Sequence, residues 1–279
     1  MARLRFTKMH GIGNAYVYVD CFAESVADPA GLARRVSPRH TGIGSDGVIL
    51  ICPSDAADCR MEMYNADGSR GEMCGNGIRC VGKYVYDHGL VRKDTLHVAT
   101  DAGIKVLHLH TRDGRVQAVT VDMGEPTLDG PRIPVAAEGR VINAPLEVDG
   151  RTYQVTCVSM GNPHCVTFAP SVDGLPLGDI GPRFEHHAFF PQRVNTEFVQ
   201  VLARNELRMR VWERGSGETA ACGTGACAAL VAAVLNDKAD RRATIHLNGG
   251  DLEIEWNAAD NHVFMTGPAE EVFTGEIEV

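Results

Sequence analysis

Two cysteines in this chain stand where a thiol can act as an acid or a base. They lie 148 residues apart (222 − 74) and open nearly identical phrases, Cys74-Gly75-Asn76-Gly77 and Cys222-Gly223-Thr224-Gly225. Each phrase precedes a run with helical apolar spacing, and the unpaired N–H groups at a helix start favour a thiolate and lower its pKa. If the halves of the chain face each other, the two thiols meet across one cleft. Such a pair can move a proton on both faces of one carbon.

The chemistry that this pair suits is removal of a proton beside a carboxylate. The α-carbon of an amino acid is a very weak acid, and many enzymes use pyridoxal phosphate as the electron sink. The sequence has no persuasive combination of a phosphate cradle and a lysine for that cofactor. Two helix starts directed at one carboxylate would stabilise the developing charge instead. We therefore expect an enzyme that uses neither a cofactor nor a metal.

The same offset of 148 residues recurs outside the cysteine phrases, which indicates one fold written twice. It carries Gly13-Asn14 onto Gly161-Asn162. Each half has strand-like segments and one apolar helix, at residues 75–86 and 225–235, and the alanine-rich second helix should be central in its domain. The prediction is an α+β protein with two similar, pseudo-symmetric domains, each a strand-rich, barrel-like sheet around a central helix.

The predicted boundary between the two halves follows residue 122. It gives residues 1–122, which carry Cys74, and residues 123–279, which carry Cys222; whether residues 268–279 return to the first half is left open. The Pro/Gly-rich residues 124–150 are interpreted as the crossing between the halves. A further helix is expected at residues 28–36, and strands at 16–20, 47–52, 60–65, 96–98, 104–109, 116–121, 153–158, 164–168, 196–202 and 207–212.

Composition excludes several classes of partner. The formal charge of −9 gives no general attraction for nucleic acid or an anionic membrane, and the N-terminal residues form no signal peptide or membrane span. The nine cysteines include no Cys-x-x-Cys and form no zinc or disulfide framework, which favours free thiols in the cytoplasm. Five of them are interpreted as small buried hydrophobic residues: Cys21, Cys52, Cys157, Cys165 and Cys227.

Five motifs follow one another along the chain. They are Lys8-Met9-His10-Gly11-x-Gly13-Asn14, Asn65–Ser69 with Met73–Gly77, Met160-Gly161-Asn162-Pro163-His164, Arg193-Val194-Asn195, and Glu213–Thr219 with Ala221–Gly225. With these motifs the chain resembles the diaminopimelate epimerase family over essentially its whole length. The resemblance implies cofactor-free interconversion of LL- and meso-diaminopimelate, on the route to lysine and cell-wall peptide, by a homodimer.

The resemblance also implies a role for each matching residue. Cys74 and Cys222 would be the acid/base pair, and His164 and Glu213 would polarise the thiols. The residues implied to bind the reacting α-carboxylate are Gly75, Asn76, Gly223 and Thr224, and those implied to hold the rest of the substrate are Asn14, Asn65, Asn162, Asn195 and Arg214. Two positions depart from the family pattern. Ala15 replaces a usual aspartate, which would loosen the turn, and Gly47 replaces a substrate-contacting glutamine of some members, which would leave specificity more open.

Other functions compete with this hypothesis. A racemase of another amino acid, such as histidine, would use the same two thiols, although the retained asparagines and Arg214 favour a substrate with a second amino-acid-like end. A cysteine hydrolase with His164 as base would leave one thiol unused, and a two-lobed binding protein would use neither. Gly42-x-Gly44-x-x-Gly47 precedes an expected strand rather than a helix, which argues against a dinucleotide-binding enzyme.

Overall fold

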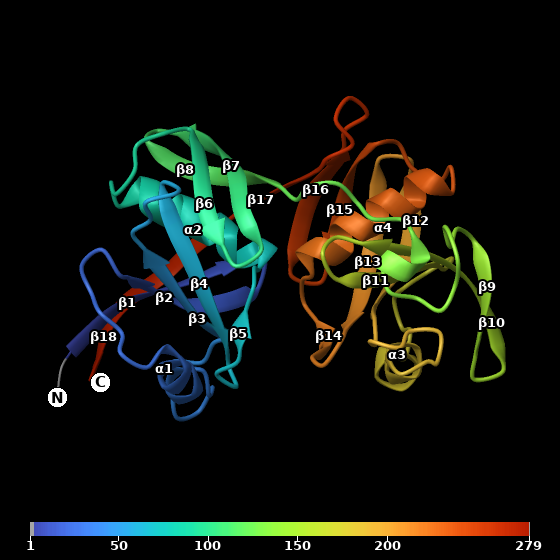
Figure 1. Ribbon diagram of the computed structural model, residues 1–279, viewed down its shortest axis with the longest axis horizontal. Coiled ribbons are helices and arrows are strands. Elements are labelled where there is room, and N and C mark those ends of the chain that lie inside the picture. Colours follow the sequence, from blue (N-terminus) through green and yellow to red (C-terminus); the bar gives the residue numbers. More distant parts are fainter. Residues whose placement is uncertain (1–2, 279) are drawn as a thin grey trace. The chain divides into compact units, whose positions relative to one another are not determined.

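The computed structural model describes residues 3–278, and its contacts divide the chain into two compact units (Figure 1). Unit 1 combines the residues up to Val121 with those from Thr266 onward, and unit 2 is Asp122–Met265. Residues 124–150 therefore lie inside unit 2. Their interpretation as a crossing between the domains was wrong. The physical reason is that apolar side chains within this Pro/Gly-rich stretch, Ile133 and Leu146 among them, pack into the core of unit 2.

Unit 1 is built around one helix, α2 (Gly75–Asp87), seen in teal among its strands in Figure 1. The apolar residues Ile78, Val81 and Val85 of α2 are fully buried. A second helix, α1 (Pro29–Val36), begins after Asp28, whose carboxylate accepts a hydrogen bond from the N–H of Gly31 at 2.8 Å. The strands of this unit are β1 (Arg3–Gly11), β2 (Asn14–Asp20), β3 (Gly47–Cys52), β4 (Cys59–Asn65), β5 (Arg70–Gly71), β6 (Thr95–Thr100), β7 (Gly103–Arg112), β8 (Arg115–Asp122) and β18 (Glu270–Glu278).

Strand β1 holds the two ends of unit 1 together. It pairs antiparallel with β2 on one side and with β18 on the other, where Leu4 lies opposite Ile277. From β2 the sheet continues through a parallel pairing with β3 and an antiparallel pairing of β3 with β4. β4 pairs parallel with β6, which leads through antiparallel pairings to β7 and β8. The C-terminal strand therefore belongs to the same sheet as the N-terminal one.

Unit 2 has the same plan around its own helix, α4 (Gly223–Leu235), orange in Figure 1. It also contains α3 (Leu177–Glu185) and a short 3-10 helix, η1 (Gly130–Arg132). No helix within residues 3–278 has the length and apolar character needed to cross a membrane. The strands are β9 (Ala144–Val148), β10 (Arg151–Ser159), β11 (Pro163–Phe168), β12 (Asn195–Ala203), β13 (Glu206–Glu213), β14 (Gly217–Thr219), β15 (Arg242–Leu247), β16 (Gly250–Trp256) and β17 (Val263–Gly267), which runs across the unit boundary.

The 148-residue repeat holds for the elements as well as for the motifs. It superposes the bounds of α2 on those of α4, and the bounds of β1 on those of β10. β10 pairs with β9 and β11 as β1 pairs with β18 and β2. The predicted α+β fold with two pseudo-symmetric halves is confirmed. The repeat also relates α1 to α3, a helix that the sequence analysis missed because Gly178, Gly181 and Pro182 interrupt its helical pattern.

Gly181 is required because α3 packs directly on Trp212 of β13. A Cβ at this position would lie 2.3 Å from Trp212 Cδ2, whereas a Cβ at Gly178 on the same helix would meet nothing within 4 Å. We expect Gly181→Ala to lower the free energy of unfolding by about 1–3 kcal/mol through overpacking. The matched control Gly178→Ala should leave stability unchanged or raise it by up to about 1 kcal/mol. Urea unfolding of both variants measures the difference, and equal stabilities would contradict the packing argument.

Candidate active site

Cys74 caps the N-terminus of α2 and contacts the side chain of Asn14. Its backbone is extended (φ −128°, ψ 119°), and its Sγ accepts a hydrogen bond from the N–H of Gly77 at 3.3 Å. The thiol lies 3.2 Å from Asn14 Oδ1, which also accepts from Asn76 Nδ2 at 3.4 Å. The structure thus brings together three of the predicted site residues, Cys74, Asn14 and Asn76, at the start of α2.

Asn14 is held in place by Asp46, a residue that the sequence analysis did not identify. Asp46 Oδ2 accepts hydrogen bonds from Asn14 Nδ2 and from the backbone N–H of Ala15, both at 2.8 Å. The loosening of the turn that the alanine suggested therefore does not occur, because a carboxylate from another part of the chain holds both residues. Asp46 follows an irregular loop and has no periodic signal in the sequence.

The backbone at position 47 requires glycine, independently of any contact with substrate. Its φ of 153° lies in the region that favours glycine, and a Cβ there would lie 2.0 Å from the carbonyl oxygen of Tyr64 on the paired strand β4. A glutamine cannot replace it without a change in this backbone. The start of β3 therefore accounts for the glycine, and its effect on specificity stays a prediction.

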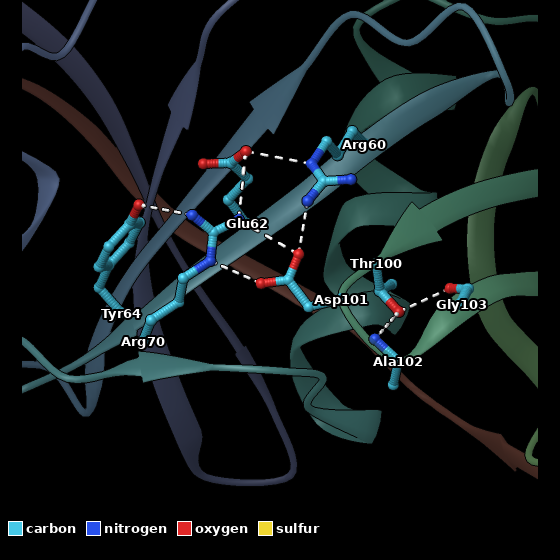
Figure 2. A network of polar contacts seen from close by, with 8 residues as sticks. All are labelled: Arg60, Glu62, Tyr64, Arg70, Thr100, Asp101, Ala102 and Gly103. Atoms are coloured by element: carbon cyan, nitrogen blue, oxygen red, sulfur yellow. Dashed lines mark hydrogen bonds and ion pairs between the residues drawn. The ribbon is translucent and has the colours of Figure 1, made fainter.

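The segment before Cys74 is held by a polar network on β4, β5 and the turn after β6 (Figure 2). Asp101 accepts hydrogen bonds from Arg70 Nε and Arg60 Nη2, each at 2.5 Å, and Arg70 is the main cause of the lowered pKa of Asp101. In the intervening turn, Asn65 Nδ2 donates to Ser69 Oγ at 3.0 Å. The network fixes β5, the last strand before Cys74, and the structure places Asn65 at the base of the turn that leads into it.

Cys222 repeats the geometry of Cys74 at the start of α4. It is extended (φ −124°, ψ 108°), its Sγ accepts from the N–H of Gly225 at 3.4 Å, and it lies 3.6 Å from Thr224 Oγ1. The lowered pKa expected at a helix start is wrong for this thiol. Burial raises the pKa of Cys222 well above its usual value, the carboxylates of Glu213 and Glu197 raise it further, and the bonds from Thr224 and Gly225 only oppose them. The resting side chain is therefore a protonated thiol.

Glu213, at the end of β13, is the carboxylate that acts on Cys222 most strongly. It accepts a short hydrogen bond from the hydroxyl of Thr219. Burial raises the pKa of Glu213, while its hydrogen bonds with Thr219 and Cys222 lower it. The carboxylate is thus adjacent to the thiol and chemically able to accept its proton.

A chain of polar side chains connects Cys222 to the interior of unit 2. Asn162 Nδ2 donates to Thr224 Oγ1 at 3.3 Å, and Asn162 Oδ1 lies 3.0 Å from His164 Nε2. The other ring nitrogen, Nδ1, lies 2.7 Å from Glu197 Oε1. Sequence reasoning identified His164 and Asn162 but missed Glu197. A charged residue directly before Phe198-Val199 in the expected strand at 196–202 was the available signal.

Asn195 and Arg214 meet at the end of β13. Asn195 Oδ1 accepts from the backbone N–H of Arg214 at 2.9 Å, and its Nδ2 donates to the carbonyl of Pro163 at 3.0 Å. Asn195 is buried and therefore positions the chain that carries Arg214. The guanidinium of Arg214 is exposed and donates to the carbonyl of Gln192 at 2.9 Å.

The remaining cysteines divide by depth. Cys157, Cys165 and Cys227 are buried, as expected, but Cys21 and Cys52 are only partly buried, which corrects the expectation for these two. Cys21 directly follows β2, where its N–H bonds to the carbonyl of Ile51, and Cys52 is the last residue of β3.

Fold and site together define a class of protein: two α+β units of the same plan, each with a cysteine capping its central helix. Solved structures share this fold, among them a hydroxyproline epimerase from Agrobacterium vitis with bound trans-4-hydroxy-L-proline. That match has a TM-score of 0.70 at 14% identity and covers 99% of this chain and 92% of that one. A probable proline racemase from Agrobacterium radiobacter K84 matches with a TM-score of 0.71 at 16% identity, covering 99% and 93%.

Sequence comparison identifies the family. The sequence profile of diaminopimelate epimerase matches residues 6–128 and 156–272. The diaminopimelate epimerase of Acetivibrio thermocellus is 58% identical over 277 residues, which cover 99% of both chains. That of Desulfovibrio desulfuricans is 57% identical over 280 residues, which cover 98% of both. The chain belongs to the diaminopimelate epimerase family.

Proposed function

We propose that the protein is an isomerase that interconverts LL- and meso-diaminopimelate, with two cysteines as acid and base and without a cofactor. Membership of the family supports the reaction. The observation that carries the mechanism is that each unit holds a cysteine as the N-cap of its central helix, with its sulfur accepting a backbone N–H three residues on.

The proposed binding site uses the two helix starts for the reacting end of the substrate. The N–H groups of Gly75, Asn76, Gly223 and Thr224 bind the α-carboxylate and stabilise the charge that develops when the Cα proton leaves. Asn14, Asn65, Asn162, Asn195 and Arg214 hold the rest of the substrate. The exposed guanidinium of Arg214 suits the distal carboxylate because it can donate two parallel hydrogen bonds.

The proton transfer follows from the state of the two thiols. One cysteine, as a thiolate, removes the Cα proton from one face, and the other returns a proton to the opposite face. Because burial keeps Cys222 protonated at rest, Cys222 is the acid and Cys74 the base in the direction that starts from this state. That transfer leaves Cys222 as the thiolate and Cys74 as the thiol, which act as base and acid in the reverse direction. When the resting enzyme instead meets the other isomer, Cys222 first passes its proton to Glu213, with which it shares a hydrogen bond, and Cys74 takes up a proton from water.

The proposed setting is lysine and cell-wall peptide biosynthesis in the cytoplasm, by a homodimer. The net charge of −9 fits a small charged metabolite bound by local groups rather than nucleic acid or a membrane surface. Sedimentation equilibrium of the purified protein tests the dimer.

Solvent exchange at Cα tests the function. The protein is incubated in deuterated water with LL-diaminopimelate and with a panel of single amino acids that includes histidine and proline, and the Cα–H signals are followed by proton NMR. We expect exchange and an LL/meso mixture with diaminopimelate alone. Exchange with histidine but not diaminopimelate would instead identify a racemase of another amino acid. No exchange with any substrate would favour a binding protein.

A further inference from the structure

Glu197 is a fully buried carboxylate for which the proposed mechanism has no role. It lies on β12, its side chain has no exposed surface, and the same holds for His164, its partner at 2.7 Å. Within residues 3–278, Glu197 Oε2 has no hydrogen-bond partner. A buried carboxylate that is only half satisfied is costly unless an adjacent positive charge balances it. The pairing with His164 therefore offsets the cost of burying this carboxylate.

The surroundings of the His164 ring indicate that both of its nitrogens carry protons. Nδ1 faces the carboxylate of Glu197 at 2.7 Å, and Nε2 faces the amide oxygen of Asn162 at 3.0 Å. With Glu197 as a carboxylate, each nitrogen faces an acceptor, and the imidazolium donates to both. The 2.7 Å separation is in the range of a charge-assisted hydrogen bond.

The start of α4 favours the charged form of Glu197. A Cβ placed on Gly225 would lie 2.7 Å from Glu197 Oε1 and 3.1 Å from Cys222 Sγ. The missing side chain at Gly225 thus lets the carboxylate and the thiol approach the same turn of the helix. Because the N-terminus of a helix stabilises negative charge, this position suits a carboxylate at Glu197.

A chain of hydrogen bonds runs from His164 through Asn162 and Thr224 to the sulfur of Cys222. When the ring is an imidazolium, His164 Nε2–H donates to Asn162 Oδ1, and Asn162 Nδ2 donates to Thr224 Oγ1 at 3.3 Å. The Thr224 hydroxyl, 3.6 Å from Cys222 Sγ, is left to donate to the sulfur. Each link orients the next, so the charge on the ring favours a thiolate at the far end of the chain.

We propose that Glu197 is a positioning residue that holds His164 as an imidazolium, and that this charge acts on the sulfur of Cys222 through Asn162 and Thr224. His164 then influences the thiol without touching it, while Glu213 is the group that exchanges a proton with the thiol. The effect on turnover rests on the proposed function, but the state of the His164 ring does not.

The first test is the protonation of His164 in the substrate-free protein. Nitrogen-15 NMR of histidine-labelled protein, with the His164 signals assigned by their loss in His164→Gln, should show both ring nitrogens protonated at neutral pH. Glu197→Gln should lose the Nδ1 proton. The matched control Glu185→Gln removes another buried carboxylate of unit 2, which bonds to Trp212 and Gly215, and should leave the His164 signals unchanged. A neutral His164 ring in the wild-type protein would overturn the proposal.

The second test is the direction in which Glu197→Gln shifts the pH midpoint for alkylation of Cys222. The ionisable groups that act directly on this thiol are Glu213 on β13 and Glu197 on β12, and His164 on β11 faces Glu197. If Glu197 acts through His164, Glu197→Gln raises the pH midpoint for alkylation of Cys222 by iodoacetamide. If Glu197 is only a nearby negative charge, the same change lowers the midpoint, which contradicts the proposal. Mass spectrometry reads the alkylation, with fragment ions that separate Cys222 from Cys227.

Turnover supplies the third measurement. Glu197→Gln should lower kcat by about ten- to hundredfold, with a smaller change in KM, and Glu197→Asp should restore part of the loss. A fall in kcat with an unchanged His164 ring and an unchanged alkylation midpoint would show a purely structural role and overturn the proposal. If the wild-type protein exchanges no diaminopimelate, the proposed function fails, and the ring and alkylation measurements still decide the role of Glu197.

Discussion

Replacing either Cys74 or Cys222 with serine is expected to lower turnover of diaminopimelate by about 10²–10⁴-fold, because in the proposed mechanism each thiol serves one face of the reacting carbon. A serine hydroxyl is a much weaker acid than a thiol and forms no useful base at neutral pH. Serine is also a favourable N-cap, so α2 and α4 should still begin at Gly75 and Gly223. The two variants should therefore unfold at nearly the wild-type temperature while losing activity.

The measurement is proton NMR of both diaminopimelate isomers in deuterated water, combined with thermal unfolding. Cys157→Ala is the matched control, since this thiol is buried opposite Cys165 in the pairing of β10 with β11. It should keep wild-type turnover and lose about 1 kcal/mol of stability. A serine variant that retained the wild-type rate would show that one thiol suffices, as a cysteine hydrolase requires.

Local patterns were sufficient for much of the fold. The two central helices and the strands β2–β4, β6–β8 and β10–β13 follow from apolar periodicity, and the repeated Cys-Gly-x-Gly phrase marks both helix starts. The strands β1, β5, β9 and β14–β18 were not expected. Helix α3 was not predictable in this way because Gly181 is set by the approach of Trp212, a contact between distant segments. Residues 124–150 were misjudged for a related reason: their prolines and glycines suggest a linker, while the burial of Ile133 is decided by packing.

For the site, sequence indicates which residues are present but not what surrounds them. The motifs contain Cys222, but the direction of its pKa change depends on burial and on two carboxylates from other strands. Neither Asp46, which holds Asn14, nor Glu197, which holds His164, lies in a predicted site motif. Each of these carboxylates contacts a residue about 30 positions away in the sequence, and only the tertiary structure brings the two together.

Glu213→Gln is expected to lower kcat by about a hundredfold or more, because an amide cannot accept the proton of Cys222. The glutamine oxygen can still accept the hydrogen bond from Thr219, so the end of β13 should keep its conformation. The control is Glu218→Gln, which changes an exposed carboxylate of β14 that bonds to Arg210 and should leave turnover unchanged. Steady-state epimerisation measured by NMR distinguishes the two, and equal activities would contradict the role of Glu213.

Glu213→Gln should raise stability relative to the wild-type protein above pH 4.5, although it lowers activity. The folded-state pKa of Glu213 is raised above its ordinary value of 4.5, mainly by burial. Its contribution to stability is therefore complete below that value and is lost as pH rises through the folded pKa. Glutamine does not titrate, so Glu213→Gln should become progressively more stable than wild type as pH rises from 4.5 toward neutrality. Urea unfolding across this range measures it, and a difference that does not change with pH would count against the raised pKa.

The thiol itself gives the sharpest comparison between the two glutamates beside Cys222. The negative charge of Glu213 raises the pKa of Cys222, so Glu213→Gln should lower the pH midpoint for its alkylation. Glu197 is also a glutamate beside this thiol. Its replacement by glutamine should nevertheless raise the midpoint, because the substitution removes the partner that keeps His164 charged. Two chemically identical substitutions should thus shift one thiol in opposite directions. Shifts of the same sign would show that both carboxylates act only as nearby charges.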